Sequence, residues 1–246
     1  WNAWKGKLLE DLYKLTVRTL GGRAPDPGAV IESRKRQALI QLALASEPQD
    51  SHKRLWDTLE VSYFMRHDAG EIAWHTRQLA RHAVRPVATK TEAVGAGGAS
   101  AGTVKTFETI VRARLSPVGE GLQVLVYAAD QPDLFARICG YFDRAGFSIL
   151  DAKIHTTRNG RALDTFQIIN PLVPDHNREF IGMVEAELPA AVESQAPLAP
   201  PRLGRVSRRV KSFPIAPRVD LRPDDKAQRW LLTVTASDRV GLLYSI

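Results

Sequence analysis

Apolar side chains recur every three or four residues through the first 83 positions of the chain. This spacing is typical of amphipathic helices, which bury one face and expose the other. Gly21 and Pro48 stand where two of these helices must end. The predicted helices cover residues 8–20, 27–45, 50–63 and 68–83.

The start of the last of these helices is marked by a polar motif. Asp68 and Glu71 have the D-x-x-E spacing of a capping box, in which each side chain accepts a hydrogen bond from a backbone N–H at the helix start. His67, Glu71 and His75 would share one face of a continuous helix at a ligand-like spacing, but the cap places His67 outside the helix. We therefore expect no metal site here, and expect Glu71 and His75 to interact on the helix surface.

Beyond residue 106 the apolar pattern changes to that of β-strands. A βαββαβ order, which is that of a ferredoxin-like sheet, is predicted between residues 122 and 213. Asn159-Gly160 is a strong hairpin signal between its second and third strands. The predicted strands cover residues 122–129, 147–157, 162–170 and 208–213, with further strand patterns at 107–114 and 230–236, and the predicted helices cover residues 132–145 and 176–192. The predicted fold class is therefore α+β.

Changes in composition predict a division into six segments. Gly97 and Gly102, in a stretch rich in glycine and alanine, have the outer spacing of a phosphate-binding loop. Thr103 and Val104 follow where that loop needs lysine and serine or threonine, so the stretch is interpreted as a connector. The predicted segments are a helical region (1–85), a flexible connector (86–106), a first sheet domain (107–193), a Pro/Arg-rich linker (194–204), a basic connection that contains a strand (205–228) and the truncated start of a second sheet domain (229–246).

The composition is that of an ordinary globular protein. Of the 246 residues, 44% are hydrophobic and 25% are charged, and no run of 18 apolar residues could form a membrane span. No secretion signal is visible, so a cytoplasmic location is expected. Cys139 is the single cysteine, which excludes an internal disulfide, and we expect its thiol to be buried on the apolar face of a helix.

The positive charge of the chain is concentrated in one stretch. Residues 202–222 hold seven lysines or arginines and one acid, and so account for nearly all of the net charge of +7. A local basic stretch is weaker support for nucleic-acid binding than a basic folded face. We therefore expect a solvated linker with an edge strand, and no specific nucleic-acid partner.

An internal repeat links residues 124–138 to residues 232–246 at an offset of 108. The two copies, VLVYAADQPDLFARI and LTVTASDRVGLLYSI, are identical at five of fifteen positions. Each copy has the pattern of a strand, a turn that begins with aspartate, and a helix. The second copy stops in its helix, so we expect an internal fragment of a longer protein whose second unit is poorly ordered or docks on a partner.

The repeated turns are the candidate effector sites, because free backbone N–H groups at a helix start can hold a carboxylate. Pro132 is expected at the first helical position of the first copy, where an ordinary capped helix start is an equally good interpretation. Gly241 replaces Asp133 in the second copy and would let a ligand approach the backbone. The favoured residues are therefore Asp238, Arg239, Val240, Gly241, Leu242 and Leu243, and the weaker candidates are Asp130, Gln131, Pro132, Asp133 and Leu134.

The repeated turn on a βαββαβ frame resembles the ACT domain, a regulatory module that typically binds amino acids. Several separated stretches resemble, more specifically, the family of bifunctional uridylyltransferase/uridylyl-removing enzymes that modify the nitrogen-regulatory PII protein. These stretches are residues 1–13, 63–67 with 71–75, 129–137, and 151–160 with 164–166.

This resemblance implies a larger enzyme with a nucleotidyltransferase domain, an HD-type hydrolase domain and two ACT domains. It implies transfer of UMP from UTP to PII, hydrolytic removal of UMP, and control of both activities by glutamine. It also implies ACT–ACT pairing and Mg²⁺ in the catalytic domains. Neither catalytic pattern is convincing in this sequence, so no catalytic residue, metal or cofactor is expected in the chain itself. The alternative is an ACT-type interaction module that binds no amino acid.

Overall fold

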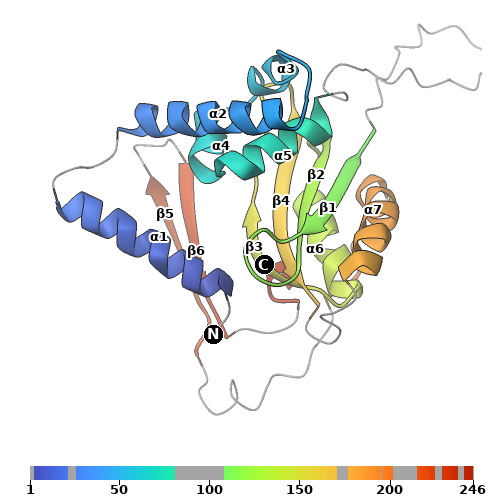
Figure 1. Cartoon of the computed structure of the whole chain (residues 1–246). Helices are drawn as coiled ribbons and strands as arrows, with labels where there is room; N and C mark the ends of the chain where they lie inside the picture. Colours follow the sequence, from blue (N-terminus) through green and yellow to red (C-terminus); the bar gives the residue numbers. More distant parts are fainter. Residues whose placement is uncertain are drawn as a thin grey trace, which may run out of the picture.

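The computed structural model describes residues 3–21, 26–80, 108–170, 177–194, 196–201, 215–224, 229–237 and 241–245. Helices and an antiparallel sheet are both present, which confirms the α+β fold class (Figure 1). The predicted connector 86–106, the predicted strand 208–213 and the turn residues 238–240 lie outside these ranges. Among the described helices, none has both the length and the apolar character needed to span a bilayer.

The N-terminal part of the chain is helical, as its periodicity predicts. The third predicted helix is wrong as a single element, because two short helices occupy it. Thr58 ends the first of them: its hydroxyl donates to the Leu55 carbonyl at 2.7 Å, and its own carbonyl accepts from the backbone N–H of Arg158 at 2.8 Å. The observed helices are α1 (Ala3–Leu20), α2 (Pro27–Leu44), α3 (Lys53–Trp56), α4 (Val61–Arg66) and α5 (Ala69–Leu79).

Four antiparallel strands form the main sheet, in the order β1-β2-β4-β3. The position beside β2 is filled by a strand that precedes it, so within the described residues the order is ββαββα and differs from the predicted βαββαβ. A short loop, 116–121, joins β1 to β2. Closing this short loop costs less entropy than bringing a strand that follows α7 back to the same edge of β2. The elements are β1 (Ile110–Leu115), β2 (Leu122–Ala129), α6 (Leu134–Arg144), β3 (Ser148–Lys153), β4 (Arg161–Ile169) and α7 (Asn177–Glu193).

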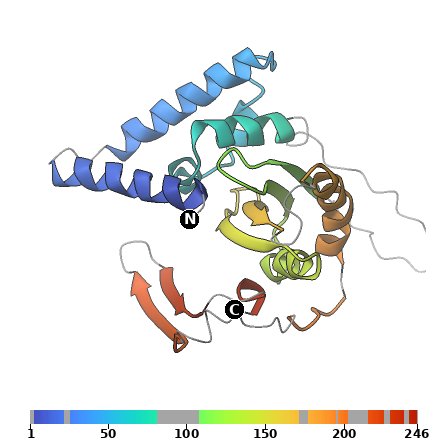
Figure 2. The same ribbon diagram turned by 60° about the horizontal axis from the view of Figure 1, so that its bottom comes forward.

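Both faces of this sheet are covered (Figure 2). Side chains alternate along β2, so Val124 and Val126 pack towards α6 and α7, while Leu125 and Tyr127 pack towards the N-terminal helices. Cys139 of α6 is buried on the first side, as predicted, and burial raises the pKa of its thiol to about 12. The helical region therefore shares a core with the sheet.

A second hairpin, β5 (Arg218–Asp224) and β6 (Arg229–Thr235), repeats the first hairpin at an offset of 108. Val111 pairs with Val126 in the first hairpin, and Val219 pairs with Val234 in the second. The repeat predicted from residues 124–138 and 232–246 therefore extends to the preceding strand.

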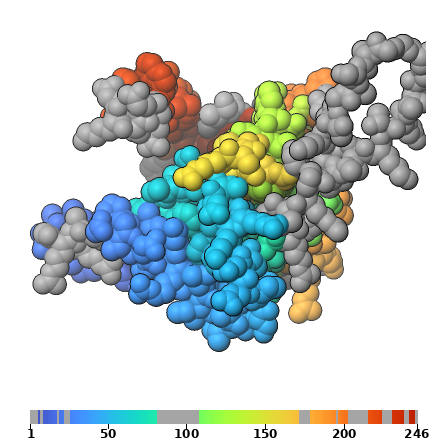
Figure 3. All heavy atoms as spheres, turned by 90° about the horizontal axis from the view of Figure 1, so that it is seen from above, coloured from blue at the N-terminus to red at the C-terminus, as the bar shows by residue number. Residues whose placement is uncertain are grey.

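The two hairpins differ in what covers their apolar face. Leu122 is 1% exposed, whereas its counterpart Trp230 is 68% exposed. Figure 3 shows the orange-red hairpin standing apart from the blue helices. Beyond the hairpin, η1 (Leu243–Ser245) places Leu243 and Tyr244 against the core beside α6. The second unit thus docks on the first through η1, while its hairpin face stays open.

Candidate functional site

The face of the main sheet that meets the helical region is polar at one end. Gln123 of β2 lies opposite Gln167 of β4, which in turn lies opposite Asp151 of β3. In the next row, Thr165 lies opposite Lys153. Asp151 and Lys153 are two residues apart on one strand and so point to the same face. These rows form a polar floor beneath α5.

Glu71 of α5 connects the helical region to this floor. The predicted capping box is present, with Glu71 N–H donating to Asp68 Oδ1 at 2.8 Å and Asp68 N–H donating to Glu71 Oε2 at 3.1 Å. The same carboxylate accepts from Lys153 Nζ at 2.7 Å on both oxygens and from Gln123 Nε2 at 2.7 Å. Burial alone would raise the pKa of Glu71, but the His67 hydrogen bond and the Lys153 charge lower it well below its usual value.

The predicted surface interaction between Glu71 and His75 is wrong, because both side chains face the sheet. Glu71 is 6% exposed and His75 is fully buried. The two nitrogens of the His75 ring lie 2.7 Å from the Tyr63 hydroxyl and 3.3 Å from the Thr165 hydroxyl. The physical reason is that α5 covers the polar end of the sheet, so its polar residues find partners there and not in water.

Three buried imidazoles gather around Tyr63. The ring of His67 lies 4.9 Å from that of His75 and 5.2 Å from that of His155, measured between centroids. Burial lowers the pKa of all three, that of His155 to about 3, so the rings are neutral near pH 7. The Nε2 atoms of His67 and His155 have no hydrogen-bond partner among the described residues. Within the described ranges, no group of three or more histidine, cysteine or acidic side chains is arranged to hold a metal ion.

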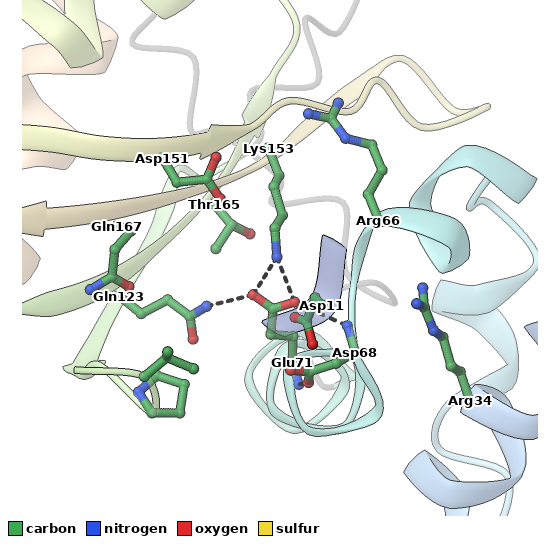
Figure 4. A pocket seen from close by; sticks show the side chains of 12 residues that line it. Asp11, Arg34, Arg66, Asp68, Glu71, Gln123, Asp151, Lys153, Thr165 and Gln167 are labelled. Atoms are coloured by element: carbon green, nitrogen blue, oxygen red, sulfur yellow. Dashed lines mark hydrogen bonds and ion pairs between the residues drawn. The ribbon is translucent and has the colours of Figure 1, made fainter. Parts of the chain in front are cut away.

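A pocket of about 320 Å³ opens beside Glu71, between the helical region and the sheet (Figure 4). Three basic and four acidic side chains line it, together with amides and a hydroxyl. Its volume is at the lower end of the range for small-molecule sites. The lining residues are Asp11, Arg34, Arg66, Asp68, Glu71, Pro117, Val118, Gln123, Asp151, Lys153, Thr165 and Gln167.

Most charged side chains in this pocket already make hydrogen bonds or ion pairs within the protein. Arg34 Nη1 donates to the carbonyls of Phe64 and Met65 at the end of α4, at 2.8 and 2.6 Å. Lys153 and Glu71 form an ion pair. Arg66 and Asp151 differ, because neither makes a hydrogen bond or ion pair with another described residue. The pocket therefore offers one cation and one anion that a bound molecule can satisfy.

The first predicted turn is occupied by contacts of its own. Asp130 Oδ2 accepts from the Thr156 hydroxyl at 3.1 Å, and Gln131 Nε2 donates to the Val192 carbonyl at 2.9 Å. The expected place of Pro132 at the first helical position is wrong. Asp133 takes a left-handed conformation, with φ of 62°, so α6 begins only at Leu134.

The second predicted turn is described in part. Asp238, Arg239 and Val240 lie outside the described residues. Gly241 has φ of 72°, and Leu243 packs against the core. None of the described turn residues lines the pocket beside Glu71. Two features of the sequence lie at that pocket and were not predicted to form a site: Gln123 within an apolar strand, and the alternation of Asp151 with Lys153.

Comparison with known proteins gives consistent matches. The sequence profile of the family described as "Uridylyltransferase GlnD fifth domain" matches residues 26–78. The protein from Ralstonia nicotianae named "Bifunctional uridylyltransferase/uridylyl-removing enzyme" is 52% identical over 250 residues, which cover 100% of this chain and 27% of that enzyme. Proteins of the same name from Cupriavidus pinatubonensis and Burkholderia lata are 50% and 49% identical, and each match covers 100% of this chain and 26% of the relative.

No solved structure shows significant similarity to the chain. The chain spans about a quarter of the length of the curated relatives that it matches. The match, with identity near 50%, nevertheless extends over all 246 residues and so includes the helical region, the sheet and the second hairpin. Over the segment that it spans, the chain is therefore similar to bifunctional uridylyltransferase/uridylyl-removing enzymes.

Proposed function

We propose that this chain is the C-terminal regulatory segment of a bifunctional enzyme that transfers UMP from UTP to the PII protein and removes it by hydrolysis. The observation that carries this proposal is the identity near 50% over the whole chain with relatives named for both activities. Glutamine is the proposed effector, and control of nitrogen metabolism is the proposed role. Because its substrates are UTP and PII, we place the enzyme in the cytoplasm.

The repeated units support a regulatory role. Two hairpins with the same register are each followed by a turn with a left-handed residue, Asp133 in the first and Gly241 in the second. Each turn leads into a helical segment, whose N–H groups suit a carboxylate. We propose the second turn, residues 238–243, as the main contact for glutamine and the first turn as the weaker one. Catalysis and its Mg²⁺ belong, in this proposal, to parts of the enzyme outside this chain.

The test separates the chain from the full-length enzyme. Full-length enzyme is assayed for UMP transfer to PII and for UMP removal over a range of glutamine concentrations. The isolated chain is titrated with L-glutamine by calorimetry. Glutamine is expected to suppress transfer, to promote removal and to bind the chain. If the full-length enzyme responded to glutamine but the isolated chain bound no glutamine, the glutamine site would lie in another part of the enzyme.

A second function is favoured by the open face of the second hairpin. Val219, Leu221, Trp230 and Leu232 share that face and are each more than half exposed. Large exposed apolar patches often mark interaction surfaces. The chain would then act as an ACT-type module that pairs with another sheet and binds no amino acid. Substituting Trp230 with Ser should weaken such pairing in analytical ultracentrifugation without changing glutamine binding.

A further inference from the structure

We propose that the pocket between Arg66 and Asp151 binds a small dipolar molecule, a free α-amino acid, with its carboxylate on Arg66 and its ammonium on Asp151. This site is separate from the turn proposed for glutamine. It lies where the helical region meets the sheet, since Arg66 ends α4 and Asp151 lies in β3.

The charges of Arg66 and Asp151 define the chemistry of the ligand. Arg66 is exposed and Asp151 is half-buried, and neither has an ionic partner among the described residues. Figure 4 shows the two side chains on either side of the Lys153 side chain, all three on the wall of one pocket. Arginine binds carboxylates through charge-assisted hydrogen bonds, and an aspartate carboxylate binds an ammonium group in the same way. A molecule that carries both a carboxylate and an ammonium group can therefore bind Arg66 and Asp151 together.

The remaining lining argues against a nucleotide. A triphosphate would meet Arg66 but would also face four carboxylates, of which Glu71 is already held by Lys153. Like charges near a protein surface repel by up to about 4 kcal/mol at roughly 4 Å. A dipolar molecule carries no net charge and avoids this repulsion. The cavity of about 320 Å³ has room for an amino acid with a polar side chain.

The polar floor supplies a contact for that side chain. Gln167 Nε2 donates to the Glu120 carbonyl at 3.2 Å, which leaves its Oε1 as an acceptor towards the pocket it lines. Lys153 uses two donor directions on Glu71 and retains a third. A ligand side chain that both donates and accepts hydrogen bonds therefore fits better than an aliphatic one.

The experiment is calorimetric titration of the whole 246-residue chain with each common L-amino acid. For the tightest ligand, two analogues follow, one without the ammonium group and one without the carboxylate. We expect each analogue to bind at least about tenfold more weakly than the amino acid, since each loses one charged contact.

Substitutions locate the binding site. Arg66→Gln and Asp151→Asn should each weaken binding at least about tenfold. Arg54→Gln and Asp220→Asn change the same charges at exposed positions outside the pocket and should bind like the unsubstituted chain. Melting temperatures of all four variants show that each is folded. Neither Arg66 nor Asp151 is bonded to another described residue, so we expect no loss of stability.

Three results would overturn the inference. They are the absence of binding by any amino acid, equal binding by the Arg66 and Asp151 variants, and equal binding by the analogue without the ammonium group. The glutamine response of the full-length enzyme is a separate measurement. If that response persists in enzyme carrying Arg66→Gln while the inference fails, the proposed regulatory function still stands.

Discussion

Asp133 and Gly241 lie 108 residues apart and share a left-handed backbone conformation, with φ of 62° and 72°. Each follows a hairpin of the same register and stands at the start of a helical segment. Left-handed backbone is costly for most residues, but glycine adopts it freely and aspartate tolerates it. The geometry of the turn thus explains why this position carries one or the other residue.

This equivalence makes Gly241→Asp a clean test of the second turn. Asp133 shows that aspartate fits this conformation, so the substitution adds a side chain and a charge with little backbone strain. In the full-length enzyme we expect glutamine control to weaken, because a like charge near the ligand carboxylate costs up to about 4 kcal/mol before screening. The measurement is the glutamine concentration that halves UMP transfer to PII.

The matched control is Asp133→Gly, which should change that concentration much less. If Asp133→Gly abolished the glutamine response and Gly241→Asp did not, the two turns would have to exchange roles. Equal effects from both substitutions would mean that the turns act together.

Catalytic activity gives a second prediction. The isolated chain should neither transfer UMP to PII nor remove it, because no catalytic motif is recognisable in its sequence. The measurement is incorporation of labelled UMP into PII with UTP and magnesium, compared with a mock preparation. Incorporation above the mock level would contradict the proposal that catalysis belongs to other parts of the enzyme.

Sequence reasoning succeeded where the interaction is local. The capping box joins Asp68 to Glu71, three residues apart, and the Asn159-Gly160 turn closes β3 onto β4 with φ of 73° at Gly160. The partners of these motifs are their own neighbours in the chain. Their geometry therefore follows from residue type and spacing.

Sequence reasoning failed where distant elements decide the outcome. Glu71 bonds to Lys153, 82 residues away, and no local pattern says which face of α5 meets the sheet. The predicted βαββαβ order ended with a strand at residues 208–213, and the periodicity at 107–114 did not reveal that this earlier segment pairs with β2. The spacing of leucines correctly predicted the helix α1 but not the cover of its apolar face, since Leu12 and Leu20 are exposed among the described residues.

The Glu71–Lys153 pair gives a prediction about stability. Lys153→Met removes the cation from a carboxylate that is 7% exposed, while the lysine itself is 21% exposed. Breaking a fully buried pair costs roughly 3–5 kcal/mol, and partial solvation of Lys153 reduces this to about 2 kcal/mol. Urea unfolding should show this loss. Arg77→Met breaks the more exposed contact to Glu47 and should cost less than about 0.5 kcal/mol.

The buried imidazoles predict acid sensitivity. His67, His75 and His155 have folded-state pKa values below the usual one, mainly because of burial, so the unfolded chain binds protons that the folded chain does not. Stability is therefore full above about pH 6.5 and falls as the pH decreases, by up to about 1.4 kcal/mol per pH unit for each such histidine. Asp164 acts in the opposite direction, because burial raises its pKa to about 7 and the folded chain holds that proton.

The destabilising effect of the three histidines exceeds the stabilising effect of the one carboxyl group, so the chain loses stability overall as the pH falls from 6.5 to 5. Urea midpoints measured across this range should fall with decreasing pH. His155→Phe removes one of the protons taken up on unfolding and should flatten the slope by about 1.4 kcal/mol per pH unit. A slope that is unchanged in this variant would mean that His155 is already protonated in the folded chain.

The last prediction concerns the unequal cover of the two hairpins. Leu122 and Val124 of β2 are buried in the core, whereas Trp230 and Leu232 at the matching positions of β6 are more than half exposed. Backbone hydrogen bonds exchange slowly when opening them also exposes a packed core. In a dilute monomer, amides of β6 should therefore exchange much faster than those of β2. Equal protection in the two strands would show that the apolar face of the second hairpin is covered in solution by the chain itself.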